Sequence, residues 1–148
     1  MKKIIRIALF CTFIFGASTT VKAQESYGNA LNVFASFGDN SSIGGFYEFT
    51  LAKNFTISPE VAIPFDFDSM YAGARVDYYF DSLVKLNEPW DIWGGVGLGF
   101  NIGNNIDDNL RWDLHIGGEY KFNEKWGIIA EFGGGSYGAG FLGVGIHL

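Results

Sequence analysis

The stretch Leu110-Arg-Trp-Asp-Leu-His-Ile-Gly-Gly-Glu-Tyr-Lys-Phe122 decides the fold, because apolar and polar side chains alternate along it. The charged residues and the histidine of this stretch all occupy odd positions: Arg111, Asp113, His115, Glu119 and Lys121. A period of two indicates a β-strand whose two faces meet different surroundings. One face of this strand is therefore apolar and the other is ionised.

The same period recurs in seven further segments. They are residues 30–38, 42–52, 55–67, 70–80, 90–102, 126–135 and 139–148. Their lengths are typical of tilted strands that cross a membrane, which need about 9–11 residues. Clusters of Gly, Asn, Asp and Ser separate them, and residues 81–89 are expected to hold a short turn of helix. The pattern predicts an all-β fold, a closed eight-stranded antiparallel up-and-down transmembrane β-barrel.

The composition of the two faces predicts which one points outward. A soluble lipocalin-like barrel would turn its apolar face inward. Here the polar face combines glycines with charges of both signs and only one lysine, which suits a narrow interior. Aromatic residues fall near both rims of the apolar face, as in the aromatic girdles of membrane barrels. The polar, inward face is expected to carry Glu48, Glu60, Asp66, Arg75, Asp77, Asp91, Arg111, Asp113, His115, Glu119, Lys121 and Glu131.

The first 23 residues have the pattern of a signal peptide. A basic start precedes a short apolar run, and the segment ends with Val21-Lys22-Ala23. We therefore expect cleavage after Ala23, export, and a mature barrel domain at residues 24–148. Cys11, the only cysteine, lies within the apolar run, so disulfides and cysteine metal sites are not expected in the mature chain.

Charge argues against a nucleic-acid partner. The whole chain has 10 basic and 16 acidic residues, and the first 23 residues contain four of the basic ones and no acid. The mature chain would keep six basic and sixteen acidic residues, a net charge of −10. Nucleic-acid binding requires clustered Lys and Arg, which such a chain does not have.

No catalytic residue, cofactor site or metal site is predicted. The run Gly95-x-Gly97-x-Gly99 resembles a dinucleotide loop but belongs to no βαβ unit. If residue 122 pairs with residue 126, His115 and Glu131 become diagonal neighbours. We interpret them, with Asp113, as part of a structural polar network rather than as an acid–base pair.

Four loop acids could in principle bind a divalent cation: Asp66, Asp68, Asp107 and Asp108. Hard cations need six or more oxygens in a defined geometry. The interpretation that we favour is that these short acidic loops are simply solvated.

A structural network inside the barrel is the main prediction for individual residues. Its members are Glu48, Glu60, Arg75, Asp77, Arg111, Asp113, His115, Glu119, Lys121 and Glu131. Arg75 is the only basic residue on the inner face of the first four strands, and unpaired buried carboxylates are costly. We therefore expect Arg75 to lie in mid-barrel, bonded to at least one of Glu48, Glu60 and Asp77. Inward-facing aromatic residues should exclude a steady pore: Phe34, Phe46, Tyr71, Tyr79, Trp93 and Phe141.

Several stretches resemble the small outer-membrane β-barrel proteins of Gram-negative bacteria, the OmpA-like and OmpX-like barrels, in the compact form found in Bacteroidetes. They are Ala74-Arg-Val-Asp-Tyr-Tyr-Phe80, Trp90-Asp-Ile-Trp-Gly-Gly-Val-Gly-Leu-Gly-Phe100, Ile116-Gly-Gly-Glu-Tyr-Lys-Phe122 and Glu131-Phe-Gly-Gly-Gly135. The resemblance implies a monomer in the cell outer membrane, in contact with lipid and lipopolysaccharide. It also implies recognition by the outer-membrane insertion machinery through Gly143, Ile146 and Leu148, although the usual final Phe is replaced by Leu.

The resemblance leaves three functions open. The first is a non-enzymatic barrel with a structural or membrane-integrity role. The second is a lipid A-modifying enzyme, since some eight-stranded relatives use a His–Ser pair on their lipid-facing surface. Here His115 and His147 fall on the inner face, and no serine lies two residues beyond either. The third is a soluble periplasmic binder of an apolar ligand.

Overall fold

The computed structural model of the chain describes residues 27–38, 41–86, 88–103, 110–135 and 139–148. The predicted signal peptide, residues 1–23, lies outside these residues. So do Asp107 and Asp108, two of the four loop acids considered as cation ligands.

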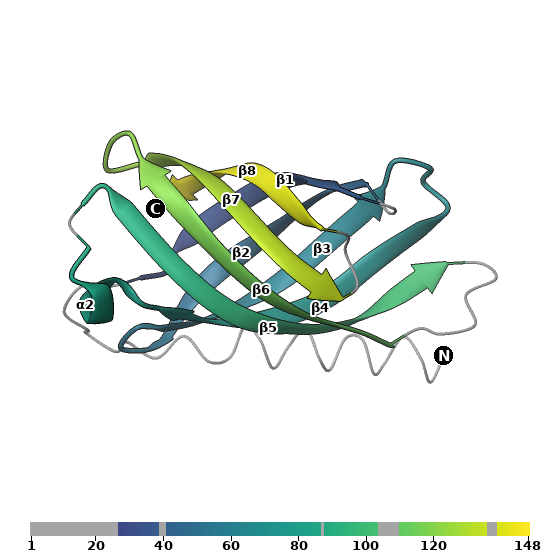
Figure 1. The fold of residues 1–148 in the computed structure, drawn as a ribbon. Coiled ribbons are helices and arrows are strands. Elements are labelled where there is room, and N and C mark those ends of the chain that lie inside the picture. Colours follow the sequence, from purple (N-terminus) through teal and green to yellow (C-terminus); the bar gives the residue numbers. More distant parts are fainter. Residues whose placement is uncertain (1–26, 39–40, 87, 104–109, 136–138) are drawn as a thin grey trace.

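Eight strands form one closed barrel in which each strand pairs with its sequence neighbours, and a single helical turn, α2, follows the fourth strand (Figure 1). Their bounds are β1 Ala30–Phe37, β2 Ser42–Ala52, β3 Phe55–Pro64, β4 Ser69–Tyr79, α2 Asp81–Val84, β5 Trp90–Gly103, β6 Leu110–Lys121, β7 Trp126–Gly135 and β8 Gly140–His147. Across the described ranges, no helix combines the length and the apolar character needed to cross a membrane.

The first and last strands close the barrel. β1 and β8 run antiparallel, with Ala30 opposite His147 and Phe37 opposite Gly140. Every strand therefore has a partner on both sides, and the sheet has no open edge. A structure without edges can satisfy its backbone hydrogen bonds in lipid. The predicted architecture, including the strand count and the helical turn after β4, is confirmed.

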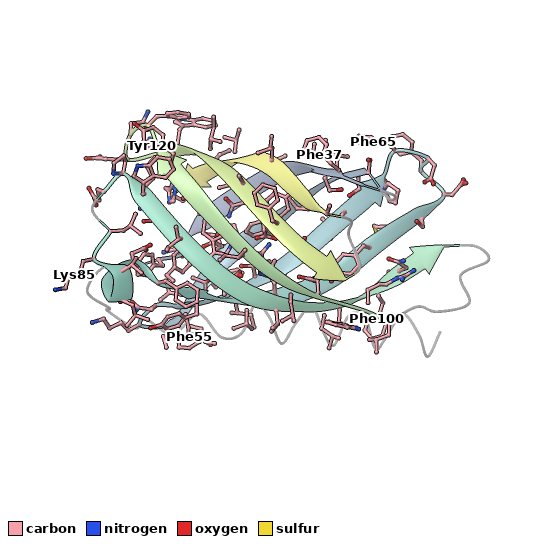
Figure 2. The ribbon with its side chains drawn as sticks, viewed as in Figure 1. Phe37, Phe55, Phe65, Lys85, Phe100 and Tyr120 are labelled. Atoms are coloured by element: carbon pink, nitrogen blue, oxygen red, sulfur yellow. The ribbon has the colours of Figure 1, made fainter. Side chains whose placement is uncertain are left out.

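The apolar face points outward, as the sequence predicts. In β6, Leu114 and Ile116 are 56% and 61% exposed, whereas Asp113, His115 and Glu119 are buried. Figure 2 shows aromatic side chains outside the wall near both ends, among them Phe100 and Tyr120. The arrangement inverts that of a soluble protein, because the large apolar side chains cover the surface and the ionised ones are enclosed.

Turns at the end of the barrel where β1 begins and β8 ends are built by local hydrogen bonds. Asn54, in the turn between β2 and β3, adopts a left-handed backbone with φ of 64°, which asparagine tolerates better than most residues. Between β6 and β7, the Asn123 side-chain oxygen accepts hydrogen bonds from the backbone N–H groups of Lys125 and Trp126, at 2.8 and 3.0 Å. This Asx turn reverses the chain within a few residues.

β3 is shorter than the sequence predicts. Alternation suggests a strand over residues 55–67 with Asp66 on the inner face, but β3 ends at Pro64. The Phe67 N–H donates to the Pro64 carbonyl at 3.0 Å, and the Asp68 N–H donates to the Asp66 carboxylate at 3.2 Å. These bonds form a tight turn, so Asp66 is exposed and does not belong to the interior.

Glycines on the inner face make room for the charged side chains. A Cβ added to Gly95 would lie 2.2 Å from Oδ1 of Asp77, and one added to Gly97 would lie 2.1 Å from Oδ2 of Asp113. Both distances are too short for any real contact. These two glycines of β5 therefore allow carboxylates from β4 and β6 to lie flat against the barrel wall.

Candidate functional site: the charged interior

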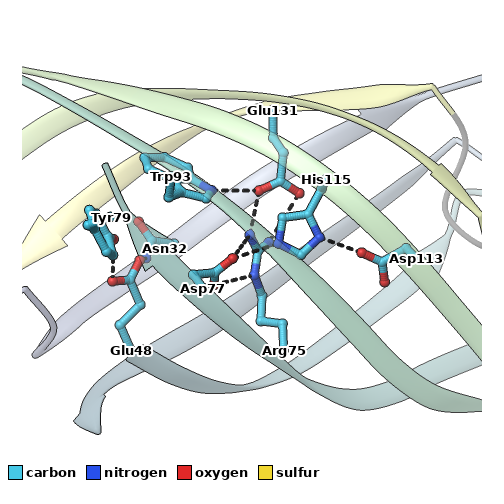
Figure 3. Close-up of polar contacts among 9 residues, drawn as sticks. All are labelled: Asn32, Glu48, Arg75, Asp77, Tyr79, Trp93, Asp113, His115 and Glu131. Carbon is cyan, nitrogen blue, oxygen red and sulfur yellow. Dashed lines mark hydrogen bonds and ion pairs between the residues drawn. The ribbon is translucent and has the colours of Figure 1, made fainter. Parts of the chain in front are cut away.

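Arg75, in the middle of β4, is the centre of the interior network and is 2% exposed. Its Nε and Nη2 donate to the two carboxylate oxygens of Asp77, at 2.8 and 2.9 Å. Its Nη1 and Nη2 also donate to Glu131 on β7, at 3.2 and 2.5 Å. The guanidinium lies 4.5 Å from the centre of the Phe46 ring, which covers it from β2. Arg75 thus binds one carboxylate of its own strand and links β4 to β7 through the other (Figure 3).

His115 lies between two further carboxylate contacts. Its Nε2 is 2.6 Å from Oδ1 of Asp77, and its Nδ1 is 2.5 Å from Oδ1 of Asp113. Asp113 is two residues before His115 on the same face of β6, whereas Asp77 comes from β4. Asp77 therefore links the arginine and the histidine, and Arg75, Asp77, Glu131, His115 and Asp113 form one continuous chain of polar contacts (Figure 3).

Two aromatic residues donate hydrogen bonds to interior carboxylates, Trp93 within this network and Tyr79 in a separate group around Glu48. The indole Nε1 of Trp93 donates to Oε2 of Glu131 at 3.0 Å. The Tyr79 hydroxyl donates to Oε2 of Glu48 at 2.7 Å, and the Asn32 amide donates to Oε1 of the same carboxylate at 2.8 Å. Buried carboxylates need such donors, because a desolvated polar group without a partner is costly.

Two ion pairs lie in the interior at the end where β1 begins and β8 ends. Nζ of Lys121 lies 2.6 Å from the Asp91 carboxylate, and Nε2 of His147 lies 2.9 Å from Glu119. Lys121 and His147 are partly exposed, so these pairs are less desolvated than the central ones. The interior therefore has a dry central network and a more solvated polar end.

Glu60 and Arg111 are placed inside the barrel but outside these bonded groups. Glu60 is 5% exposed and makes no hydrogen bond or ion pair with another described residue. It lines a small cavity together with Arg75, Asp113, His115 and Glu131. Arg111, near the start of β6, is partly exposed, and its buried Nε has no hydrogen-bond partner within the described structure.

The arrangement ties β4, β6 and β7 together through charged side chains. Both ring nitrogens of His115 are occupied by carboxylates, so neither is presented to a substrate. No group of three or more metal-ligating side chains converges within the part of the chain that the structure describes. Gly95, Gly97 and Gly99 lie in the middle of a strand and not before a helix, so they form no dinucleotide loop.

Sequence reasoning placed the charged residues on the inner face, correctly except for Asp66, but missed several contacts. It anticipated a bond from Arg75 to Glu48, Glu60 or Asp77, and the structure gives Asp77, with Glu131 as an unforeseen second partner. The register does make His115 and Glu131 diagonal neighbours, since Gly117 pairs with Glu131 and Gly133 with His115.

Trp93, Tyr79 and Asn32 were not recognised as hydrogen-bond donors. The sequence does contain a signal for these contacts, because the alternation places all three residues on the inner face. A buried tryptophan or tyrosine usually has a hydrogen-bond partner for its N–H or O–H group. The same reasoning applies to the asparagine, whose inward amide needs partners in a dry interior.

Comparison with solved structures supports the fold. The N-terminal β-barrel domain of Pseudomonas aeruginosa OprF superposes with a TM-score of 0.63 at 18% identity, covering 80% of this chain and 97% of that one. A de novo designed transmembrane β-barrel gives 0.60 at 14%, covering 83% and 98%. The solution structure of the designed barrel TMB2.3 gives 0.62 at 15%, covering 85% and 98%.

No protein-family model matches the sequence, and no curated protein matches it either. At these sequence identities, the similarity to the solved structures is evidence for the fold alone. The closed eight-stranded wall, the exposed apolar face and these neighbours together give the chain the fold of a small OmpA-like outer-membrane β-barrel.

Proposed function

We propose that this chain is a small integral protein of a Gram-negative outer membrane, exported with a cleaved signal peptide, which serves a structural or membrane-integrity role. The observation that carries the proposal is the inside-out distribution of side chains. Apolar residues such as Leu114 and Phe132, 56% and 69% exposed, would be a large aggregation hazard in water. The same residues are well accommodated against lipid acyl chains.

The filled interior supports a barrel without a steady open pore. Eight strands leave a lumen that side chains can just fill. Phe34 and Phe141, on the adjacent strands β1 and β8, stack inside it with ring centres 4.4 Å apart, and Tyr79 and Trp93 lie at the end where β1 begins and β8 ends. Arg75 extends from β4 to Glu131 on β7 and so crosses this space.

We propose that the protein is not an enzyme. A lipid-modifying barrel would need its catalytic group on the lipid-facing surface, whereas His115 is buried and held by two carboxylates. The proposed partners are outer-membrane lipid and lipopolysaccharide around a monomer. The insertion machinery would recognise the last strand, where Ile146 and Leu148 continue the alternation.

Membrane fractionation and heat-modifiable electrophoresis test the location. The proposal expects the protein in the outer-membrane fraction, with a folded form that migrates differently from the boiled one. Recovery in the soluble periplasmic fraction would instead favour a binder of apolar ligands. Lipid A mass spectrometry of a deletion strain separates the remaining alternatives, since an unchanged lipid A profile is expected only for the non-enzymatic barrel.

A further inference from the structure

A cavity lies beside the central network, toward the end of the barrel where β1 ends and β8 begins. Phe34 and Phe141 form part of its wall, Gly133 and Gly140 another part, and the side chain of Glu60 faces it from β3. Its volume is about 20 Å³, enough for about one particle the size of a water molecule.

Two carboxylates at this cavity have oxygen atoms without a hydrogen-bond partner among the described residues. Glu60 is 5% exposed and forms neither a hydrogen bond nor an ion pair with any described residue. Oδ2 of Asp113 is buried and also has no hydrogen-bond partner, although Oδ1 of the same residue contacts His115. Both groups line the one cavity.

The neighbouring cations are already engaged. Arg75 is bound by Asp77 and Glu131, and His115 lies between Asp77 and Asp113. Arg111 does not line the cavity and forms no ion pair within the described residues. The described walls therefore hold more carboxylates than cations, and buried charges are normally paired or bound to an ion.

We propose that the cavity binds one small monovalent cation, of the class of sodium, potassium or ammonium, held by the Glu60 carboxylate and Oδ2 of Asp113. A single water could donate a hydrogen bond there but could not neutralise the charge. The space is too small for a cation that keeps its hydration shell, so the ion enters largely dehydrated. Divalent ions fit poorly, because they are harder to dehydrate and the described residues hold no group of three or more metal-ligating side chains. The inference needs the closed interior but not the proposed cellular role.

Thermal unfolding of the purified full chain in detergent tests the site. Chloride salts of sodium, potassium, rubidium and ammonium are compared at equal ionic strength with that of N-methyl-D-glucamine, which cannot enter. A ligand that binds only the folded state raises its stability. We expect at least one small cation to raise the midpoint by roughly 2–4 °C, and Glu60→Gln and Asp113→Asn to remove the difference. Asp66→Asn, which removes an exposed carboxylate, should keep it.

Crystals of the unmodified protein grown with rubidium provide a test that needs no variant. The proposal expects an anomalous peak in the cavity near Glu60. Equal midpoints in all salts, together with a cavity that holds only water, would overturn it. So would an infrared band of a protonated carboxylic acid that Glu60→Gln abolishes, because a proton would then supply the missing positive charge.

Discussion

Replacing Arg75 by leucine should destabilise the barrel severely. The guanidinium is 2% exposed and makes four contacts with Asp77 and Glu131, at 2.5 to 3.2 Å. The substitution leaves both carboxylates buried without their cation, and breaking a buried ion pair costs about 3–5 kcal/mol. The loss of the contact with Phe46 adds about 0.5–2 kcal/mol. We therefore expect the free energy of unfolding to fall by at least about 3 kcal/mol.

Urea unfolding in lipid vesicles, followed by tryptophan fluorescence, measures this loss. Arg111→Leu is the matched control, because Arg111 is partly exposed and forms no ion pair among the described residues. It should cost about 0.5 kcal/mol. Adding Glu131→Gln to Arg75→Leu should recover part of the stability, since one unpaired charge is removed. Equal costs for the two arginine variants, or no recovery in the double variant, would refute the central role of Arg75.

Three further predictions concern the barrel wall and the predicted signal peptide. Leu114→Arg places a charge on the exposed face near the middle of β6 and should lower the free energy of unfolding in a bilayer by about 2–4 kcal/mol. A decrease of only about 0.5 kcal/mol, as expected at a water-exposed site, would contradict lipid contact. Gly95→Ala puts a Cβ 2.2 Å from Oδ1 of Asp77 and should lower the urea midpoint by an amount equivalent to about 1–3 kcal/mol. Gly134→Ala is its control, because a Cβ there meets no atom within 4 Å and should change the midpoint little. N-terminal sequencing of protein recovered from the membrane should begin at Gln24, and an intact N-terminus would contradict the predicted signal peptide.

The two-residue alternation of apolar and polar side chains predicted most of the fold. It predicted eight strands, their approximate bounds and the direction of each face, because a membrane barrel separates lipid-facing from interior residues along every strand. It failed at residues 65–67, where Phe65-Asp66-Phe67 continues the alternation but forms a turn. Local hydrogen bonds from Phe67 and Asp68 outweighed the pattern there, and alternation cannot reveal such bonds.

Contacts across the lumen were less predictable than faces. The alternation of apolar and polar residues shows that four residues point inward: Arg75, Asp77, His115 and Glu131. It does not give the position of each side chain along the barrel axis. That position depends on the registers of all the intervening strands, so the Asp77–His115 and Arg75–Glu131 contacts are visible only in the structure. The sequence indicates only that inner glycines suit a narrow interior, whereas the structure shows that those beside Asp77 and Asp113 each make room for a particular carboxylate.

The central claim is that apolar side chains of the wall face lipid while the ionised ones are enclosed. Spin labels on Leu114→Cys, Ile116→Cys and Leu142→Cys in lipid vesicles test it most directly, because Cys11 is the only native cysteine and lies in the predicted signal peptide. The three labels should collide frequently with oxygen, which concentrates in the bilayer, and rarely with a water-soluble nickel complex. Labels at these positions that collide mainly with the nickel complex would contradict the account.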